Sequence, residues 1–148
     1  MKAPSNPSPR ILVCGVNWLG DAVMSMPALQ ALRDHHAHAD LTILTKPGLA
    51  PLWAMSPIPH RVLSLPPPGG SLKPIIRTLR DMEFEVSYVL PHSFRSAIPP
   101  FLAKIPRRIG FPGHFPRDLM LTDVRPAAAG PGRTHQVFEY FDLFFPGE

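Results

Sequence analysis

The segment best suited to chemistry is the loop Asn17-Trp18-Leu19-Gly20-Asp21, which follows an apolar run and opens a helical pattern. A carboxylate in the first turn of a helix is stabilised in its charged form by the helix dipole, and it would repel a phosphate placed there. At the carboxyl end of a parallel strand, such a carboxylate suits a hydroxyl group, from which it can take a proton. Asp21 is therefore a candidate general base, and the alternative is that it only caps the helix.

A second polar segment, His92-Ser93-Phe94-Arg95-Ser96, also follows an apolar run. Ser93 can cap a helix, and Arg95 offers a fork of N–H donors to a carboxylate or a phosphate. His92 can donate or accept a hydrogen bond. These residue types favour a binding loop for an anionic ligand, and the alternative is an ordinary capped helix start with a solvated arginine.

The chain is basic, with a net charge of +4, and the excess is concentrated in one stretch. Between Glu85 and Asp118 there is no acidic residue but there are five cations. They are Arg95, Lys104, Arg107, Arg108 and Arg117. No aromatic-interleaved or recognition-helix pattern accompanies them, so the stretch favours a small anionic ligand over nucleic acid.

Three other features of the sequence have weaker claims to chemistry. The cluster His35, His36 and His38 has no Cys, Asp or Glu at metal-ligand spacing, so we expect no metal site. Asn17 occupies the middle glycine position of a dinucleotide fingerprint, where a side chain would obstruct a pyrophosphate. Cys14, the single cysteine, lies in an apolar run and is expected to be a buried small hydrophobe rather than a nucleophile.

The composition bounds the class of protein. Proline makes up 21 of the 148 residues, about three times the usual roughly 5%. Leu, Ile, Val and Phe number 42 of the 148 residues, above the share of roughly 20% below which a chain tends to be disordered, and the length suits one domain with its own core. No apolar run is long enough for a membrane helix, and the first residues lack a signal-peptide core. We therefore expect a cytoplasmic protein.

Short apolar runs alternate with helical patterns, and this predicts an α/β fold with a mostly parallel sheet flanked by helices. The predicted strands are 11–16, 41–45, 62–65, 86–90, 108–111 and 119–124, and the predicted helices are 20–36, 49–55, 71–82, 93–105 and 133–144. In the first helix the face expected to lie on the sheet carries Ala22, Met26, Leu29 and Leu32. Most prolines fall between elements. A kink or a restart is expected at Pro27, Pro51, Pro99 and Pro100.

Taken together, five segments resemble the N-terminal half of the ADP-heptose:lipopolysaccharide heptosyltransferases, glycosyltransferase family 9, and within it most closely the heptosyltransferase II branch. The segments are ILVCGVNWLGDAVMSMPALQALR, LTILTKPGLAPLW, VSYVLPHSFRSA, IPRRIGF and THQVFEYFDLF. They keep the family's order through nearly all of residues 11–145. The resemblance implies a Rossmann-like domain, the acceptor-side half of a GT-B fold, over residues 11–148. It follows a disordered, proline-rich stretch at residues 1–10, and we expect the C-terminal nucleotide-sugar domain to be absent.

The resemblance also implies a function and a set of site residues. The enzyme would transfer heptose from ADP-heptose, its donor substrate, to the anionic lipopolysaccharide inner core with inversion, without a further cofactor. Asp21 would be the general base. The substrate-binding residues carried over are Asn17, Trp18, Gly20, His92, Ser93, Arg95, Ser96, Arg107 and Arg108. We expect the enzyme to act at the cytoplasmic face of the inner membrane, with peripheral contact to the membrane surface. We expect it not to bind nucleic acid, and we expect this chain to be inactive alone. The alternative is a non-catalytic α/β module that binds an anion or nucleic acid.

Overall fold

The computed structural model describes residues 8–127 and 135–147, in which six strands form one sheet. The strands are β1 (Arg10–Cys14), β2 (Asp40–Thr45), β3 (Arg61–Ser64), β4 (Val86–Val89), β5 (Arg107–Gly110) and β6 (Asp123–Val124). They run in the order β3-β2-β1-β4-β5-β6, and every neighbouring pair is parallel. This is the Rossmann order, in which the chain reverses its direction of winding between β1 and β4. The predicted fold class is confirmed.

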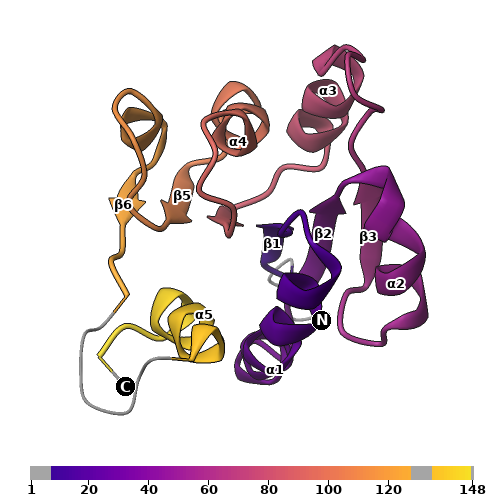
Figure 1. Ribbon diagram of the computed structural model, residues 1–148. Helices are drawn as coiled ribbons and strands as arrows, with labels where there is room; N and C mark the ends of the chain where they lie inside the picture. The colour runs from indigo at the N-terminus through magenta and orange to yellow at the C-terminus, as the bar shows by residue number, and fades with distance from the viewer. Residues whose placement is uncertain (1–7, 128–134, 148) are drawn as a thin grey trace, which may run out of the picture.

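Helices cover both faces of this sheet (Figure 1). One face packs against α1 (Leu19–His35), α2 (Ala50–Met55) and α5 (Gln136–Phe144), and the other packs against α3 (Lys73–Asp81) and α4 (Ile98–Leu102). Within the described residues there are also three short 3₁₀ helices. They are η1 (Pro47–Leu49), η2 (Arg95–Ala97) and η3 (Arg117–Met120).

The core is divided into two apolar clusters by the sheet. In β1, Ile11 and Val13 belong to the cluster under α1 and α5, whereas Leu12 and Cys14 belong to the cluster under α3 and α4. Successive side chains of a strand point to opposite faces, so a strand that is covered on both faces must be apolar throughout. This is why the continuous apolar runs of the sequence located the strands.

The prolines of the helices lie where a proline can be accommodated. Pro51 and Pro99 stand in the first turns of α2 and α4, where the missing N–H would be unpaired in any case. Pro27 is different, because α1 continues through it over 17 residues without a restart. Its ring deprives the Val23 carbonyl of a helical partner, but Val23 lies on the exposed side of the helix, where water can replace the bond.

Two predicted elements are wrong in detail. The segment 119–124 is mostly not a strand, because the amides of Leu119 and Leu121 bond to the carbonyls of Pro116 and Asp118 in η3, and β6 is two residues long. The predicted helix 93–105 is broken into η2 and α4. In α1, Met26 is only partly buried, and Ser25 and Ala28 share the sheet-facing side with Ala22, Leu29 and Leu32.

Some predictions fall at the ends of the described ranges. Of the expected disordered segment 1–10, residues 1–7 lie outside the described residues, whereas Arg10 opens β1 and donates to the carbonyl of Met82. The first two residues of the predicted helix 133–144 also lie outside them, and α5 begins at Gln136. Within the two described ranges, no helix is both long enough and apolar enough to cross a bilayer.

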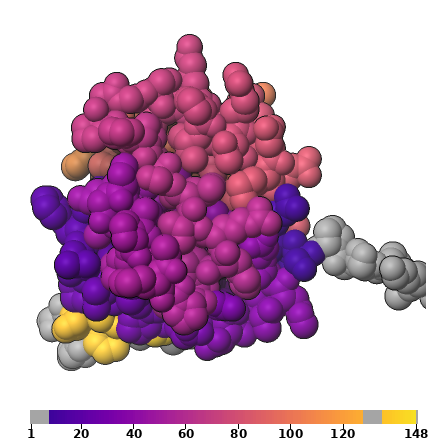
Figure 2. Space-filling view, turned by 90° about the vertical axis from the view of Figure 1, so that its right-hand side faces the viewer, coloured from indigo at the N-terminus to yellow at the C-terminus, as the bar shows by residue number. Residues whose placement is uncertain are grey.

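β3 is an edge strand of the sheet, and its end residues Arg61 and Ser64 are exposed. Seen from that side, the surface is formed largely by the magenta part of the chain, from η1 and α2 to α3 (Figure 2). Most of the predicted site residues lie elsewhere, where the chain leaves the carboxyl ends of β1 and β4.

Candidate active site at the carboxyl edge of the sheet

The two predicted loops meet at the point where the strand order reverses. Gly15 donates from its amide to the carbonyl of Leu44 at 2.8 Å, and Leu90 donates to the carbonyl of Cys14 at 3.1 Å. The chain therefore leaves β1 and β4 side by side, and open α/β sheets bind their ligands outside this junction. Two cavities lie here, and Asn17 and Pro91 line both of them.

The smaller cavity has a volume of about 230 Å³ and gathers polar side chains from three parts of the chain. The loop after β1 and the first turn of α1 supply Asn17, Trp18 and Asp21, and the loop after β4 supplies His92. The first turns of α5 supply Gln136, Glu139 and Tyr140. The cavity thus joins the predicted base to residues that are more than a hundred positions away in the sequence.

Asp21 stands in the first turn of α1 but does not act as its cap. The N-cap position is occupied by Trp18, which makes no side-chain capping bond. Among residues 8–127 and 135–147, the half-buried Asp21 carboxylate has no hydrogen-bond or ion-pair partner. A carboxylate with free lone pairs at the edge of a cavity can accept a proton from a hydroxyl group.

Two contacts with the segment after β5 hold the His92 ring in place. Its ring stacks on Phe111 with the ring centroids 5.2 Å apart and the planes at 20°. Its Nδ1 atom lies 3.4 Å from the carbonyl oxygen of Pro112. This orients the exposed imidazole at the wall of the smaller cavity, where it can contact a polar ligand.

Arg117 is one of the five cations of the basic stretch that was predicted to face an anionic ligand, and for this residue the prediction is wrong. Its side chain is completely buried and connects loops to one another. The guanidinium donates to the carbonyls of Pro91 at 2.6 Å, Phe111 at 2.8 Å and Ser93 at 3.0 Å. It therefore fixes the backbone on both sides of His92. Gly113 makes room for this contact, since a Cβ atom there would lie 2.9 Å from Arg117 Cδ.

Tyr140 was not singled out from the sequence. Its hydroxyl accepts from Gln136 Nε2 at 3.0 Å, and burial together with the nearby charge of Asp21 raises its pKa to about 12. It stays protonated and can donate a hydrogen bond inside the cavity. The signal available was the spacing of Gln136, Glu139 and Tyr140, which places three polar side chains on one face of a short helix.

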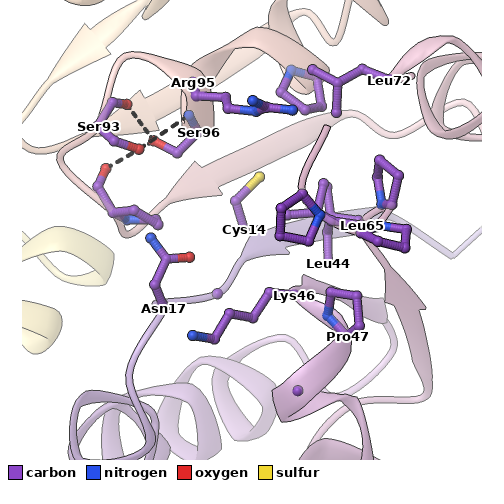
Figure 3. Close-up of a pocket in the computed structure, with 17 residues that line it drawn as sticks. Cys14, Asn17, Leu44, Lys46, Pro47, Leu65, Leu72, Ser93, Arg95 and Ser96 are labelled. Atoms are coloured by element: carbon purple, nitrogen blue, oxygen red, sulfur yellow. Dashed lines mark hydrogen bonds between the residues drawn. The ribbon is translucent and has the colours of Figure 1, made fainter. Parts of the chain in front are cut away.

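The larger cavity, of about 550 Å³ (Figure 3), shares Asn17 and Pro91 with the smaller one. Its wall includes four of the predicted binding residues, Arg95, Ser93, Ser96 and Asn17, together with Lys46, which follows β2 and was not predicted. Ser96 donates from its hydroxyl to the carbonyls of Ser93 and Pro91 at 2.6 and 3.2 Å, which shapes the loop that carries Arg95. The rest of the wall is apolar, formed by leucine and proline side chains.

Cys14 forms part of the wall of this larger cavity but is only 4% exposed. Burial raises the pKa of its thiol to about 12, so it remains a thiol at neutral pH. A thiol is a far weaker nucleophile than a thiolate. The prediction of a buried small hydrophobe is confirmed.

Arg107 and Arg108 are not brought to this edge. They begin β5 and pair with Val86 and Ser87 at the amino end of β4, on the side of the sheet opposite to the two loops. Arg108 donates to the carbonyls of Ile105 and Met120, both at 2.6 Å, and its guanidinium lies over Phe101. The structure thus gives Arg108 a role in holding loops together.

Trp18 and Gly20 lie at the amino end of α1. The Trp18 side chain is 72% exposed, and Lys46 Nζ lies 5.1 Å from the centre of its ring. Gly20 is in α1, and a Cβ atom there would meet nothing within 4 Å, so no packing in the described residues requires glycine. Nowhere in the part of the chain that the structure describes do three His, Cys, Asp or Glu residues group as metal ligands.

Comparisons with known proteins point in one direction. Residues 73–147 match the sequence profile of glycosyltransferase family 9 (heptosyltransferase). Lipopolysaccharide heptosyltransferase 2 of Escherichia coli K12 is 33% identical over 121 residues, and lipooligosaccharide heptosyltransferase 2 of Haemophilus ducreyi is 32% identical over the same length. Each alignment covers 78% of this chain and 34% of the relative, so the chain spans about a third of these proteins.

Solved structures agree with the sequence comparisons. The structure of E. coli ADP-heptose lps heptosyltransferase II has a TM-score of 0.79 at 29% identity, covering 92% of this chain and 40% of that one. A glycosyl transferase family 9 protein of Veillonella parvula has a TM-score of 0.78 at 18% identity, covering 91% and 40% of the two chains, and shows the shared fold.

Proposed function

Because this chain belongs to glycosyltransferase family 9, we propose that it is the acceptor-binding, base-bearing N-terminal part of an enzyme that transfers heptose from ADP-heptose to the lipopolysaccharide inner core. The observation that carries the proposal is the carboxylate of Asp21, which lines the smaller cavity and has no partner within the described residues. Residues 11–148 would form the acceptor-side domain.

In the proposed reaction the acceptor sugar lies in the smaller cavity with one hydroxyl against Asp21. The carboxylate takes the proton of this hydroxyl while its oxygen attacks the anomeric carbon of the heptose from the face opposite to the leaving group. The bond from the anomeric carbon to ADP breaks through an oxocarbenium-like state, so the configuration is inverted. The departing diphosphate needs hydrogen-bond donors of its own, which we assign to the nucleotide-binding half of the GT-B architecture.

The neighbouring side chains have positioning roles in this proposal. Asn17, Trp18 and His92 line the cavity around Asp21 and would contact the acceptor sugar. Ser93, Ser96 and Arg95 would contact it from the larger cavity. Arg107 and Arg108 lie at the other end of β5, so they are not included in the acceptor contacts.

The acceptor is a glycolipid by the resemblance, so we place this reaction at the cytoplasmic face of the inner membrane. The nucleic-acid-binding alternative is not favoured. Of the five cations in the stretch that suggested it, Arg117 is buried and Arg108 donates to backbone carbonyls, so those two are not presented to a polyanion.

The proposal is tested with a chimera in which this chain replaces the matching part of E. coli heptosyltransferase II. Asp21→Asn is expected to lower kcat by about 10²–10⁴-fold, the usual contribution of a general base, with little change in acceptor KM. Asp34→Asn is the matched control, because Asp34 lies in the same helix, accepts from Gln30 at 2.9 Å and lines neither cavity. If Asp21→Asn and Asp34→Asn have equal kcat values, Asp21 is not the general base and its role is only structural.

A second measurement uses the 148-residue chain by itself. Its transfer rate is expected to be negligible, because a donor that is not held against the base forfeits an effective molarity of about 10⁵–10⁸ M. Turnover comparable to that of the chimera would contradict the proposal that the donor must be held by a separate nucleotide-binding half.

A further inference from the structure

The side of the sheet that is covered by α3 and α4 has an outer surface in which exposed apolar side chains lie among exposed cations. We call it the outer basic surface. It is formed by α3, α4 and η3 and by the residues next to them, and these elements lie in one row in Figure 1, with η3 in orange between β5 and β6. Its apolar residues are Phe101, Leu102, Phe115 and Leu119, and its cations are Lys73, Arg77, Arg80 and Lys104. None of these eight residues lines either cavity.

Most of the positive charge of this surface comes from α3. Lys73, Arg77 and Arg80 are four and three residues apart, which places them on one side of the helix. Ile75 and Leu79 are buried on the other side, against the sheet. Because its apolar side is already covered, α3 contributes charge to the outer basic surface, and the exposed apolar groups come from α4 and η3.

Two arginine side chains join α3, α4 and η3 to one another. Arg80 donates to the carbonyl of Leu102 at 2.8 Å, which links α3 to the end of α4. The Arg108 guanidinium lies 5.3 Å from the centre of the Phe101 ring and donates to the carbonyl of Met120 at 2.6 Å, which links α4 to η3. The cations of α3 and the apolar residues of α4 and η3 are therefore held on one continuous surface.

The charge of the outer basic surface is not neutralised within the described residues. None of its four cations forms an ion pair there. The three elements contain two acidic residues, Asp81 and Asp118, and the Asp118 carboxylate already pairs with Arg117 at 3.3 Å. The surface is therefore positive and attracts an anionic partner.

The residue types of this surface distinguish between anionic partners. Nucleic acid is bound by cations together with aromatic rings that stack on bases, and the aliphatic side chain of Leu119, which is 68% exposed, has no part in such binding. Interfaces between proteins are depleted in lysine. A bilayer that contains anionic lipids uses both kinds of side chain, because its surface potential attracts cations and its interfacial region takes up apolar groups.

From these observations we propose that the outer basic surface is the face by which this chain lies on a bilayer of anionic phospholipids. Lys73 and Arg77 contact the headgroups, and the side chains of Phe115 and Leu119 enter the boundary between headgroups and acyl chains. This inference goes beyond the proposed function, because it concerns residues that have no part in catalysis or acceptor binding there. A chain without transferase activity would bind the bilayer equally well.

The test is sedimentation of the 148-residue chain with sucrose-loaded vesicles that contain no glycolipid. Vesicles of phosphatidylethanolamine and phosphatidylglycerol are compared with vesicles of phosphatidylcholine alone, at low and at high salt. The variants are the double substitution Lys73→Gln/Arg77→Gln and the single substitution Leu119→Ser. Their controls are Arg61→Gln and Met55→Ser, because Arg61 is an exposed cation of β3 and Met55 is an 80% exposed apolar residue of α2, both outside the outer basic surface.

The unaltered chain should sediment with the anionic vesicles at low salt, be released at high salt, and stay in solution with the neutral vesicles. The double substitution should lower the partition coefficient by about 25-fold, since each cation near an anionic bilayer contributes about fivefold. Leu119→Ser should lower it by about tenfold, through the loss of apolar area that enters the bilayer. Each control should change it by less than about twofold. Far-ultraviolet circular dichroism shows whether each variant is folded.

Failure of this inference is separable from failure of the proposed function, because the vesicles contain neither donor nor acceptor. If the chain does not sediment with the anionic vesicles, or if Met55→Ser lowers the partition as much as Leu119→Ser, the bilayer assignment is overturned and the proposed transfer reaction stands. Retention on duplex DNA without binding to vesicles would overturn it in favour of a nucleic-acid surface. A dimer in analytical ultracentrifugation that Leu119→Ser dissociates would overturn it in favour of a second copy of this chain.

Discussion

Replacement of Arg117 by methionine tests whether this buried cation is a structural tie. Its side chain is 0% exposed and donates to three backbone carbonyls, those of Pro91, Phe111 and Ser93. Methionine fills much of the space of the arginine stem but donates nothing, so these carbonyls lose their charged partner. The guanidinium no longer has to be desolvated, which offsets part of the loss. Each buried carbonyl left without a partner costs about 1–3 kcal/mol, so three of them, less the desolvation that is no longer needed, come to about 3–5 kcal/mol.

The assay is urea denaturation of Arg117→Met, followed by far-ultraviolet circular dichroism. The free energy of unfolding should fall by about 3–5 kcal/mol with little change in the denaturant slope. Lys104→Met removes another cation of the same stretch, but an exposed one, and should change stability by no more than about 0.5 kcal/mol. If the two variants lie within about 1 kcal/mol of one another, Arg117 is not a structural tie.

Two other outcomes follow from burial and close packing. Because burial raises the pKa of Cys14 from 9.0 to about 12, the unfolded chain loses its thiol proton first as the pH rises. The contribution of the buried thiol to the free energy of unfolding should therefore be fully present below pH 9 and should be lost between pH 9 and 12, by up to about 4 kcal/mol. In Cys14→Ala the free energy of unfolding should decline less steeply over this pH range, and an equal decline would show that Cys14 is not responsible. Gly113→Ala should lower the thermal midpoint, since its Cβ atom would lie 2.9 Å from Arg117 Cδ and 3.1 Å from the His92 carbonyl oxygen, at a cost of about 1–3 kcal/mol. Gly20→Ala, whose Cβ atom meets nothing within 4 Å, should not lower it, and equal losses in the two variants would refute the packing argument.

The sheet could be predicted from the sequence because a strand covered on both faces has few alternatives to a continuous apolar run. The segment 119–124 shows where this reasoning ends. Its apolar residues Met120 and Leu121 do pack into the core, but through the turn of η3, which is anchored by the buried side chain of Arg117. Nothing in the local pattern reveals a guanidinium whose partners stand as many as 26 residues away.

The candidate site could be predicted only in part, for a related reason. The loops at Asp21 and His92 were found because each directly follows an apolar run, and the strand order then brings them together. Lys46 follows an apolar run too, but a single lysine has no spacing that distinguishes it from a solvated one. Arg107 and Arg108 look like ligand contacts in the sequence, yet they are the first residues of their strand, and the amino ends of parallel strands lie at the other edge.

The contact between Lys46 and Trp18 also provides an optical reporter. The chain has two tryptophans, and Trp53 is completely buried in the core, whereas Trp18 is largely exposed beside the smaller cavity. A soluble collisional quencher should therefore extinguish the fluorescence of Trp18 and spare that of Trp53. A molecule that displaces the ammonium from the indole, or shields the indole from the quencher, will change the emission of one fluorophore alone, so occupancy of the carboxyl edge of the sheet can be followed in the native chain without a label.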